Sequence, residues 1–600
     1  MTAILTRPTP AGTARPPRAE GRRTAPWTGP AALVAAAGAA WAIAATTMRD
    51  APWSMFGLLT AASPLFAASI LLAALGFCLA IAVQARRTAI AALVTTVIVM
   101  RLPMTVGVAE PSYSWTYKHF GVVDYIQRFG AVDQSIDIYH NWPGAFALVA
   151  WLNDVTGTDT TSVALWFPVL VQLAIAYAVY HLCRSRDMPV WTSLVAAYLA
   201  HAANWVAQDY MSPQAIAFTL GIVVLALLLS STRSRAAAWV AVAIFAGIVV
   251  THQLTPFWLI AATAALTILG RIRPRYLVVV LVAIAVGYML LHLDVLSRFG
   301  SLLNFDLLAN LQTRAQQSGG TPSIGQSVNS LAARIVSGAV WVSAAAVIVR
   351  RFVRHPRQRR ETLTVATIAF SPLLILIGQG YGGEAIFRVF MYSLPGCAMI
   401  LAPAVTALLQ ARRRGRTARR RGRTARASSA WGRRSTAIVG VAAMTLLSAQ
   451  AYYGGWFANL VTTESVDVAT RILTEEDPST LTIGVAPGAP GRLVAEYADF
   501  VRSSAAFDTG IDTWLNSWWE DEDFSDPTRM NRMTETLLGT GQRSIMLITR
   551  QMRYYNDYYG TLPAGALDNL IRIVDADPRW ILEYASDDIL MYRLDDGAGG

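Results

Sequence analysis

Polar residues that could carry acid–base or phosphate chemistry lie in short stretches between long apolar segments. The stretch VAEPSYSWTYKHFGVVDYIQRFG (108–130) holds two carboxylates, Glu110 and Asp124, beside Lys118 and His119. A carboxylate that is partly screened from water has a raised pKa and can take a proton from a hydroxyl group. An amphipathic helix whose charges only face water explains the same pattern, and the sequence leaves both interpretations open.

A second stretch carries aromatic and amide side chains of the kind that bind sugars. In DIYHNWPGAF (137–146), the residues Tyr139, His140, Asn141 and Trp142 could stack on a sugar ring and hydrogen-bond its hydroxyl groups. Anchoring of Tyr and Trp at a membrane surface accounts for the aromatic residues equally well.

Two polar turns interrupt otherwise apolar sequence. QDYMSPQ (208–214) contains Asp209 and Gln214; an ordinary proline-containing turn, which does not need Gln and Asp together, is the alternative. THQLTP contains His252, either a substrate-binding residue or a histidine that is hydrogen-bonded within a helical bundle. Polar residues at membrane depth are costly, so their clustering indicates function.

The fifth stretch, GQGYGGEAIFRVFMYSLP (378–395), combines a glycine-rich turn containing Tyr381 with a helix. Glu384 and Arg388 are four residues apart, so on a helix they share one face and can form an ion pair. An arginine in this position also suits a lipid-linked phosphate. A purely structural ion pair is the alternative.

The elements that must position these residues are membrane-spanning helices. The chain has 600 residues, of which 54% are hydrophobic and 15% charged, and about 20 apolar residues in a helix cross a bilayer. Thirteen segments are long and apolar enough: 30–47, 57–84, 88–108, 162–182, 189–207, 214–231, 236–251, 255–270, 276–292, 331–350, 361–379, 386–410 and 436–456. The first is expected to be a retained helix rather than a cleaved signal peptide.

Arginines between these segments predict which side each loop faces. With the basic tail 1–29 disordered and cytoplasmic, every arginine-rich loop falls inside, as the positive-inside rule requires. The largest, 411–434, repeats RRRGRTAR. This topology explains the net charge of +12 without nucleic acid as a partner. All five polar stretches then lie on the outer face.

Two outer loops have distinct patterns. Within loop 109–161, the apolar run 142–152 is too short to span and predicts a helix that lies in or re-enters the membrane interface. Loop 293–330, rich in Gly, Ser and Gln, is either a flap over a site or a plain linker.

The C-terminal part, 458–600, is expected to be a separate extracytoplasmic domain. It holds 24 acidic and 11 basic side chains, a net charge of −13, so the rest of the chain has +25. Buried strands are predicted at 481–487 and 544–550, a helix near 563–575 and a β-hairpin at 580–594. The fold class is therefore a multi-pass α-helical membrane protein with an α/β domain. An acidic stretch, EDEDFSD (520–526), could bind a divalent cation or be a solvated loop.

As a layout, the whole chain resembles the GT-C superfamily of membrane glycosyltransferases, which includes arabinosyltransferases of actinobacterial cell envelopes. The resemblance rests on a carboxylate directly after a spanning helix, the outer helix pair, further polar outer loops, and an outer α/β domain that ends in a hairpin. Glu110-Pro111 resembles the Asp/Glu-Pro near the family's catalytic carboxylate. The chain departs from the family because two spans precede the one that leads into this loop.

The resemblance implies an inverting transfer of a sugar from a polyprenyl-phosphate donor to a cell-envelope glycan or glycolipid. Glu110, or Asp124, would be the general base. Arg388 paired with Glu384, together with Lys118 or a divalent cation, would neutralise the departing phosphate. The remaining polar residues would bind the sugars: His119, Tyr139, His140, Asn141, Trp142, Asp209, Gln214, His252 and Tyr381. The outer domain would receive the acceptor.

Two other functions remain open from the residues alone. A polysaccharide polymerase or ligase for lipid-linked glycans also has many spans and an outer catalytic loop, but its loop is richer in arginine and histidine than 293–330. A transporter or envelope scaffold should show internal repeats, which are not visible in the sequence. The sequence contains no Walker loop, HExxH or dinucleotide fingerprint.

Overall fold

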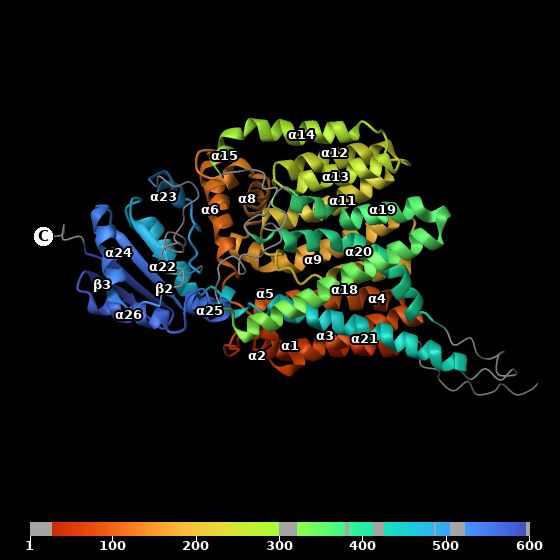
Figure 1. Ribbon diagram of the computed structural model, residues 1–600, viewed down its shortest axis with the longest axis horizontal. Coiled ribbons are helices and arrows are strands. Elements are labelled where there is room, and N and C mark those ends of the chain that lie inside the picture. Colours follow the sequence, from red (N-terminus) through yellow and green to blue (C-terminus); the bar gives the residue numbers. More distant parts are fainter. Residues whose placement is uncertain are drawn as a thin grey trace, which may run out of the picture.

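Long apolar helices form one elongated bundle, and a smaller sheet domain lies beyond one end of it (Figure 1). The computed structural model describes residues 27–298, 306, 321–377, 383–411, 425–484, 486, 488–503 and 523–595. Several predicted features lie outside these ranges: most of the tail 1–29, most of loop 293–330, Tyr381, the centre of the basic loop 411–434, and residues 520–522 of the acidic stretch.

Within the described residues, nine helices are long and apolar enough to cross a membrane, and four apolar helices are shorter. The nine are α1 (Thr28–Ala45), α3 (Pro64–Val83), α4 with α5 (Arg86–Arg101 and Pro103–Val106), α9 (Thr160–Ser185), α11 (Pro213–Ser230), α18 (Ile324–Arg354), α19 with its flanking turns η1 and η2 (Arg359–Phe370; Pro356–Gln358; Ser371–Ile377), α20 (Ala385–Leu409) and α21 (Ala425–Tyr453). The shorter four are α10 (Val190–Ala202), α12 (Arg235–Val249), α13 (Thr255–Ile268) and α14 (Leu277–Leu291). Each of the thirteen predicted segments corresponds to one of these helices, so the predicted multi-pass fold is confirmed.

Local sequence determines where several of these helices begin. Ser63, Asp159, Ser212 and Ser323 each precede a helix, and each side chain accepts a hydrogen bond from a backbone N–H in the first turn. These residues satisfy donors that have no partner within the helix. Proline follows directly in two of them, at the position where its missing N–H costs nothing.

Helix α20 lies in the middle of the bundle and is its most buried span. Its residue Gly396 packs against α19 so closely that a Cβ atom would lie 2.3 Å from the backbone nitrogen of Ala369. This contact fixes the position of α20, and with it the position of Arg388 in the first turn.

Three short helices lie where the bundle meets the sheet domain: α6 (Ser114–Phe129), α7 (Ile138–Asn141) and α8 (Gly144–Thr156). In Figure 1, α6 runs across the ends of the long helices rather than along them. The predicted non-spanning run 142–152 is therefore part of a short helix, α8. One face of α8 leaves Leu148, Trp151 and Val155 exposed, as expected for a helix that contacts lipid.

Arginine-rich loops meet at the other end of the bundle. Glu361 pairs with Arg186 at 2.7 Å and with Arg271 at 2.8 Å, and Arg233 pairs with Asp187 at 2.9 Å. The structure thus brings these predicted inner loops together at one end.

The sheet domain has mixed topology. Its elements are η5 (Phe457–Asn459), α22 (Thr463–Glu475), β1 (Leu481–Gly484), α23 (Tyr497–Ser503), α24 (Pro527–Gly539), β2 (Ser544–Thr549), α25 (Arg550–Tyr559), α26 (Ala566–Ala576), β3 (Trp580–Ala585) and β4 (Ile589–Leu594). Two short helices outside this domain, α2 (Leu58–Ala61) and α15 (Leu293–Arg298), complete the described helices. The strand order is β1-β2-β4-β3, with β1 parallel to β2 and the other pairs antiparallel. The predicted strands, helix and hairpin are all present.

The sheet domain and α6 share one apolar core. Tyr117, Phe120 and Val123 of α6 belong to the same buried cluster as Ile483 of β1 and Ile545 of β2. Burial of apolar surface is the main favourable contribution to such an association. The domain is therefore packed onto the helices that lie across the end of the bundle.

Candidate active site

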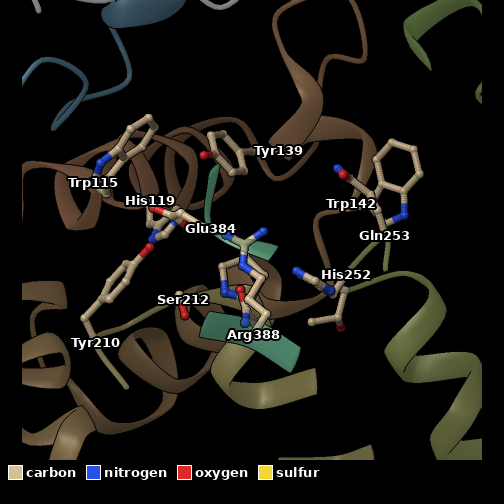
Figure 2. A pocket seen from close by; sticks show the side chains of 13 residues that line it. Trp115, His119, Tyr139, Trp142, Tyr210, Ser212, His252, Gln253, Glu384 and Arg388 are labelled. Carbon is tan, nitrogen blue, oxygen red and sulfur yellow. Dashed lines mark hydrogen bonds and ion pairs between the residues drawn. The ribbon is translucent and has the colours of Figure 1, made fainter. Parts of the chain in front are cut away.

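A polar cavity of about 220 Å³ opens between the end of the bundle and the short helices α6 and α7. Thirteen residues line it: Trp115, His119, Tyr139, Trp142, Tyr210, Ser212, Pro213, Gln214, Thr251, His252, Gln253, Glu384 and Arg388. They come from all five polar stretches of the sequence. Figure 2 shows Arg388 and Glu384 in the middle of the view, with His119, Tyr210 and Trp115 to one side and His252, Gln253 and Trp142 to the other.

Arg388 and Glu384 form the charged pair of this cavity. Arg388 donates from Nη2 to Glu384 Oε2 at 2.8 Å, and the arginine side chain is 10% exposed against 39% for the glutamate. Gln208 also donates to Glu384, at 3.4 Å. The two charges cancel, so an anion that bound Arg388 would compete with Glu384.

His119 presents a hydrogen-bond acceptor. Its Nδ1 lies 2.7 Å from the carbonyl oxygen of Met211. A carbonyl only accepts, so Nδ1 carries the proton and Nε2 of the neutral ring is an acceptor. Burial lowers the pKa of His119 to about 4, so the ring is neutral at pH 7.

His252 has the opposite arrangement. Its Nδ1 accepts from the backbone N–H of Thr255 at 3.3 Å and lies 3.0 Å from the Thr255 hydroxyl group, which is also 2.8 Å from Tyr392. Because a backbone N–H only donates, the proton of the neutral ring lies on Nε2. Burial, and next the charge of Arg388, lower the pKa of His252 to about 3. This histidine is therefore a neutral donor.

Gln214 adds a second donor. It is 3% exposed, and its Nε2 has no hydrogen-bond partner among the described residues. A buried donor of this kind is costly unless it has an acceptor, which a bound ligand would supply.

Aromatic rings form the other walls. The Tyr210 ring lies parallel to His119 with 5.9 Å between the ring centres, and Tyr139 lies edge-on to His119 at 5.3 Å. Trp142 contacts Tyr288 and His292 of α14 and its C-terminal end. Flat apolar faces beside hydrogen-bonding groups are suited to sugar rings.

Seven of the predicted site residues line the cavity: His119, Tyr139, Trp142, Gln214, His252, Glu384 and Arg388. Lys118 is the neighbour of His119 on α6, and its Nζ lies 4.0 Å from the centre of the Trp115 ring. Lys118 itself is buried and does not line the cavity.

Glu110 and Asp124, the predicted bases, lie elsewhere on the same segment. Glu110 accepts a hydrogen bond from the Thr463 hydroxyl group at 3.2 Å, and burial raises its pKa. Asp124 pairs with Arg128 at 2.8 Å and accepts from the backbone N–H of Ala495 at 2.8 Å. Neither lines the cavity, and Asp124 faces the sheet domain.

Three other predicted ligands are held in the protein's own packing. His140 contacts the Tyr497 hydroxyl group at 2.9 Å, and Asn141 donates to the carbonyl oxygen of Asp137 at 2.8 Å. Asp209 lies beneath its turn, 2.7 Å from Arg101.

Sequence reasoning did not select six other residues that line the cavity: Trp115, Tyr210, Ser212, Pro213, Thr251 and Gln253. All six lie within the polar stretches that it did identify. The sequence was therefore sufficient to find the stretches that line the cavity. Which side chains of a stretch point into the cavity depends on the tertiary structure. Among the described residues, no group of three or more His, Cys, Asp or Glu side chains could hold a metal ion.

The fold and the cavity together define a multi-pass membrane protein whose polar cavity lies between a helical bundle and an α/β domain. No protein-family model matches the chain, and no curated protein matches it. Among solved structures, it is similar to ArnT from Cupriavidus metallidurans bound to undecaprenyl phosphate, with a TM-score of 0.44 and 12% identity over 85% of this chain and 98% of that one. The same protein in the apo state has a TM-score of 0.42 and 12% identity, covering 86% and 100%.

Proposed function

We propose that this protein is a GT-C-type membrane glycosyltransferase that moves a sugar from a polyprenyl-phosphate donor to a cell-envelope glycan or glycolipid. One observation carries the proposal: five separate polar stretches converge on one cavity that combines an arginine, two neutral histidines of opposite hydrogen-bonding character, and aromatic walls. In this proposal the cavity lies at the outer face of the cell membrane, opposite the arginine-rich loops. Nucleotide sugars are absent outside the cytoplasm, so the donor must be delivered by lipid.

The donor phosphate would bind beside Arg388. Guanidinium groups suit phosphate because two N–H groups can donate to two oxygens at once. The Nε2–H group of His252 and the amide of Gln214 would supply further donors. When the bond between the sugar and the phosphate breaks, the phosphate leaves with both electrons, and these donors stabilise its added charge.

The acceptor hydroxyl group would attack the anomeric carbon from the opposite face of the sugar. Its proton goes to a base, for which the cavity offers His119 Nε2. The low pKa of this ring makes it a weak base in the empty cavity, and a bound phosphate anion raises that pKa. Glu110, whose pKa is already raised by burial, is the carboxylate that the sequence predicted for this role.

The test is transfer of radiolabelled sugar by the purified full-length protein in proteoliposomes supplied with polyprenyl-phosphate sugars and envelope lipid acceptors. We expect Arg388→Met and His119→Gln to lose transfer while protein level and thermal unfolding stay as in the wild type. Asp187→Asn, which alters an exposed ion pair with Arg233 at the other end of the bundle, serves as the control and should stay active.

Other outcomes identify where the proposal fails. If Glu110→Gln abolishes transfer and His119→Gln retains it, the base is the predicted carboxylate. If no variant of the cavity affects transfer, the cavity is not the active site. Extension of a lipid-linked glycan by whole chains would instead indicate a polymerase or ligase, and flux of a solute without bond formation a transporter.

A further inference from the structure

Asp137 divides its two carboxylate oxygens between the cavity wall and the sheet domain. Oδ1 accepts from the backbone N–H groups of Tyr139 at 2.8 Å and His140 at 3.1 Å, which closes the turn of α7. Oδ2 accepts from Arg492 Nη1 at 3.1 Å and from the Tyr497 hydroxyl group at 3.1 Å. One side chain thus joins the turn that carries Tyr139 to a segment of the other domain.

The same segment also contacts α6, the helix that carries Trp115 and His119. The carbonyl oxygen of Arg492 accepts from the backbone N–H of Gly121 at 2.9 Å, two residues beyond His119 on α6. A Cβ atom on Gly121 would lie 2.2 Å from this oxygen and 2.6 Å from the Tyr497 ring. The backbones therefore approach as closely as glycine alone permits. Two of the elements that line the cavity, α6 and the α7 turn, are therefore in contact with Arg492 and its neighbours.

Stability alone does not account for this pair. The side chains of Asp137 and Arg492 are both 0% exposed. The cost of removing two charges from water offsets most of their attraction, so apolar residues of similar size would hold the interface as well or better. The shared apolar cluster around Tyr117 and Phe120 already holds the domain in place. What a buried, hydrogen-bonded ion pair adds is a defined geometry.

We infer that Asp137 and Arg492 are positioning residues through which the sheet domain sets the place of the Tyr139–Trp142 wall relative to His119. The consequence for catalysis rests on the proposed function. Because the link is reciprocal, whatever displaces Arg492 displaces the cavity wall, and a ligand that orders the wall orders the contact with the domain.

The test compares Asp137→Asn, Arg492→Met and the control Arg502→Met in the full-length protein in nanodiscs. Asparagine keeps the oxygen that closes the α7 turn but removes the charge that faces Arg492. Arg502 forms an ion pair with Asp133 at 2.8 Å in the same interface, but its side chain is 43% exposed, so its loss should change little. Three quantities are measured: amide hydrogen exchange of residues 138–142 and 144, affinity for undecaprenyl phosphate, and sugar transfer.

We expect both link variants to exchange these amides about tenfold faster, because the turn opens locally. Their transfer should fall roughly tenfold to a hundredfold, as for a misplaced catalytic site. Because each single variant leaves one buried charge without its ion-pair partner, its unfolding temperature should fall below that of Arg502→Met, and exchange and transfer are therefore compared at a temperature at which every variant is fully folded. If exchange, affinity and transfer all equal those of the control, or if transfer falls only in proportion to unfolded protein, the pair is structural and the inference is wrong.

The two proposals fail in different ways. A wild-type protein that neither binds undecaprenyl phosphate nor transfers sugar contradicts the proposed function. The exchange measurement needs no ligand, so it still decides whether Arg492 holds the cavity wall.

Discussion

The pairing of Arg388 with Glu384 predicts that two substitutions at the same site change phosphate affinity in opposite directions. Arg388→Met keeps an unbranched side chain but removes the charge. A hydrogen bond to a charged group is worth about 1.5–3 kcal/mol, so affinity for undecaprenyl phosphate should weaken by roughly 10- to 150-fold. The remaining Glu384 carboxylate would then repel the phosphate as well.

Glu384→Gln removes the anion that competes for Arg388. The pair has an N–O distance of 2.8 Å, but the glutamate side chain is 39% exposed, so the pair is worth no more than about 1 kcal/mol. Relief of this competition should strengthen phosphate binding by up to about fivefold.

Both variants can be measured in nanodiscs by native mass spectrometry with undecaprenyl phosphate, alongside thermal unfolding as a check on folding. Undecaprenol, which has the same chain without the phosphate, is the control ligand and should bind all three proteins alike. If Glu384→Gln weakens phosphate binding as much as Arg388→Met does, the pair acts as one structural unit and the competition is refuted.

Three further predictions concern protonation, packing and topology. Because the pKa of His119 is lowered to about 4, the unfolded chain takes up a proton near pH 6.5 that the folded ring does not. In thermal unfolding, the unfolding temperature of the wild type should therefore fall relative to that of His119→Gln as the pH is lowered from about 6.5 to 4. A difference between the two unfolding temperatures that does not change with pH would contradict the burial of His119. Gly121→Ala should destabilise the protein by about 1–3 kcal/mol because its Cβ meets Arg492, whereas Gly38→Ala, with open space around it, should not; equal unfolding curves would contradict the close contact. In a background without native cysteines, an impermeant maleimide added outside should label Ser327→Cys but not Ser429→Cys, and the reverse would overturn the proposed orientation.

The helical part of the fold was predictable because its signals are local. A run such as 64–83 is apolar over its whole length, and a serine or aspartate cap marks the start of several helices. The hairpin at 580–594 has the same local character, since two alternating runs surround one turn. Arginine-rich loops were likewise identified as a group, and the structure brings Arg186, Arg233 and Arg271 to one end of the bundle through their ion pairs.

The site was only partly predictable, because a polar stretch presents different residues to different neighbours. On α6, His119 points toward the cavity. Asp124 instead pairs with Arg128 of the same helix and accepts a hydrogen bond from Ala495 of the sheet domain. In the turn at 208–214, Gln214 faces the cavity while Asp209 is buried against Arg101. Sequence spacing shows which residues share a face of a helix. Which of these faces is free to contact a ligand depends on which elements of the protein pack against the remaining faces.

The spanning helices, the α/β character of the C-terminal domain and the five polar stretches follow from the sequence alone. Hydrophobic length, strand alternation and helix caps are properties of neighbouring residues. Tertiary structure alone decided that these stretches meet in one cavity, that His119 and His252 have opposite hydrogen-bonding roles, and that Asp137 joins the cavity to Arg492. Those features depend on contacts between residues up to hundreds of positions apart. Their energies come from burial and hydrogen-bond geometry, which exist only once the chain has packed.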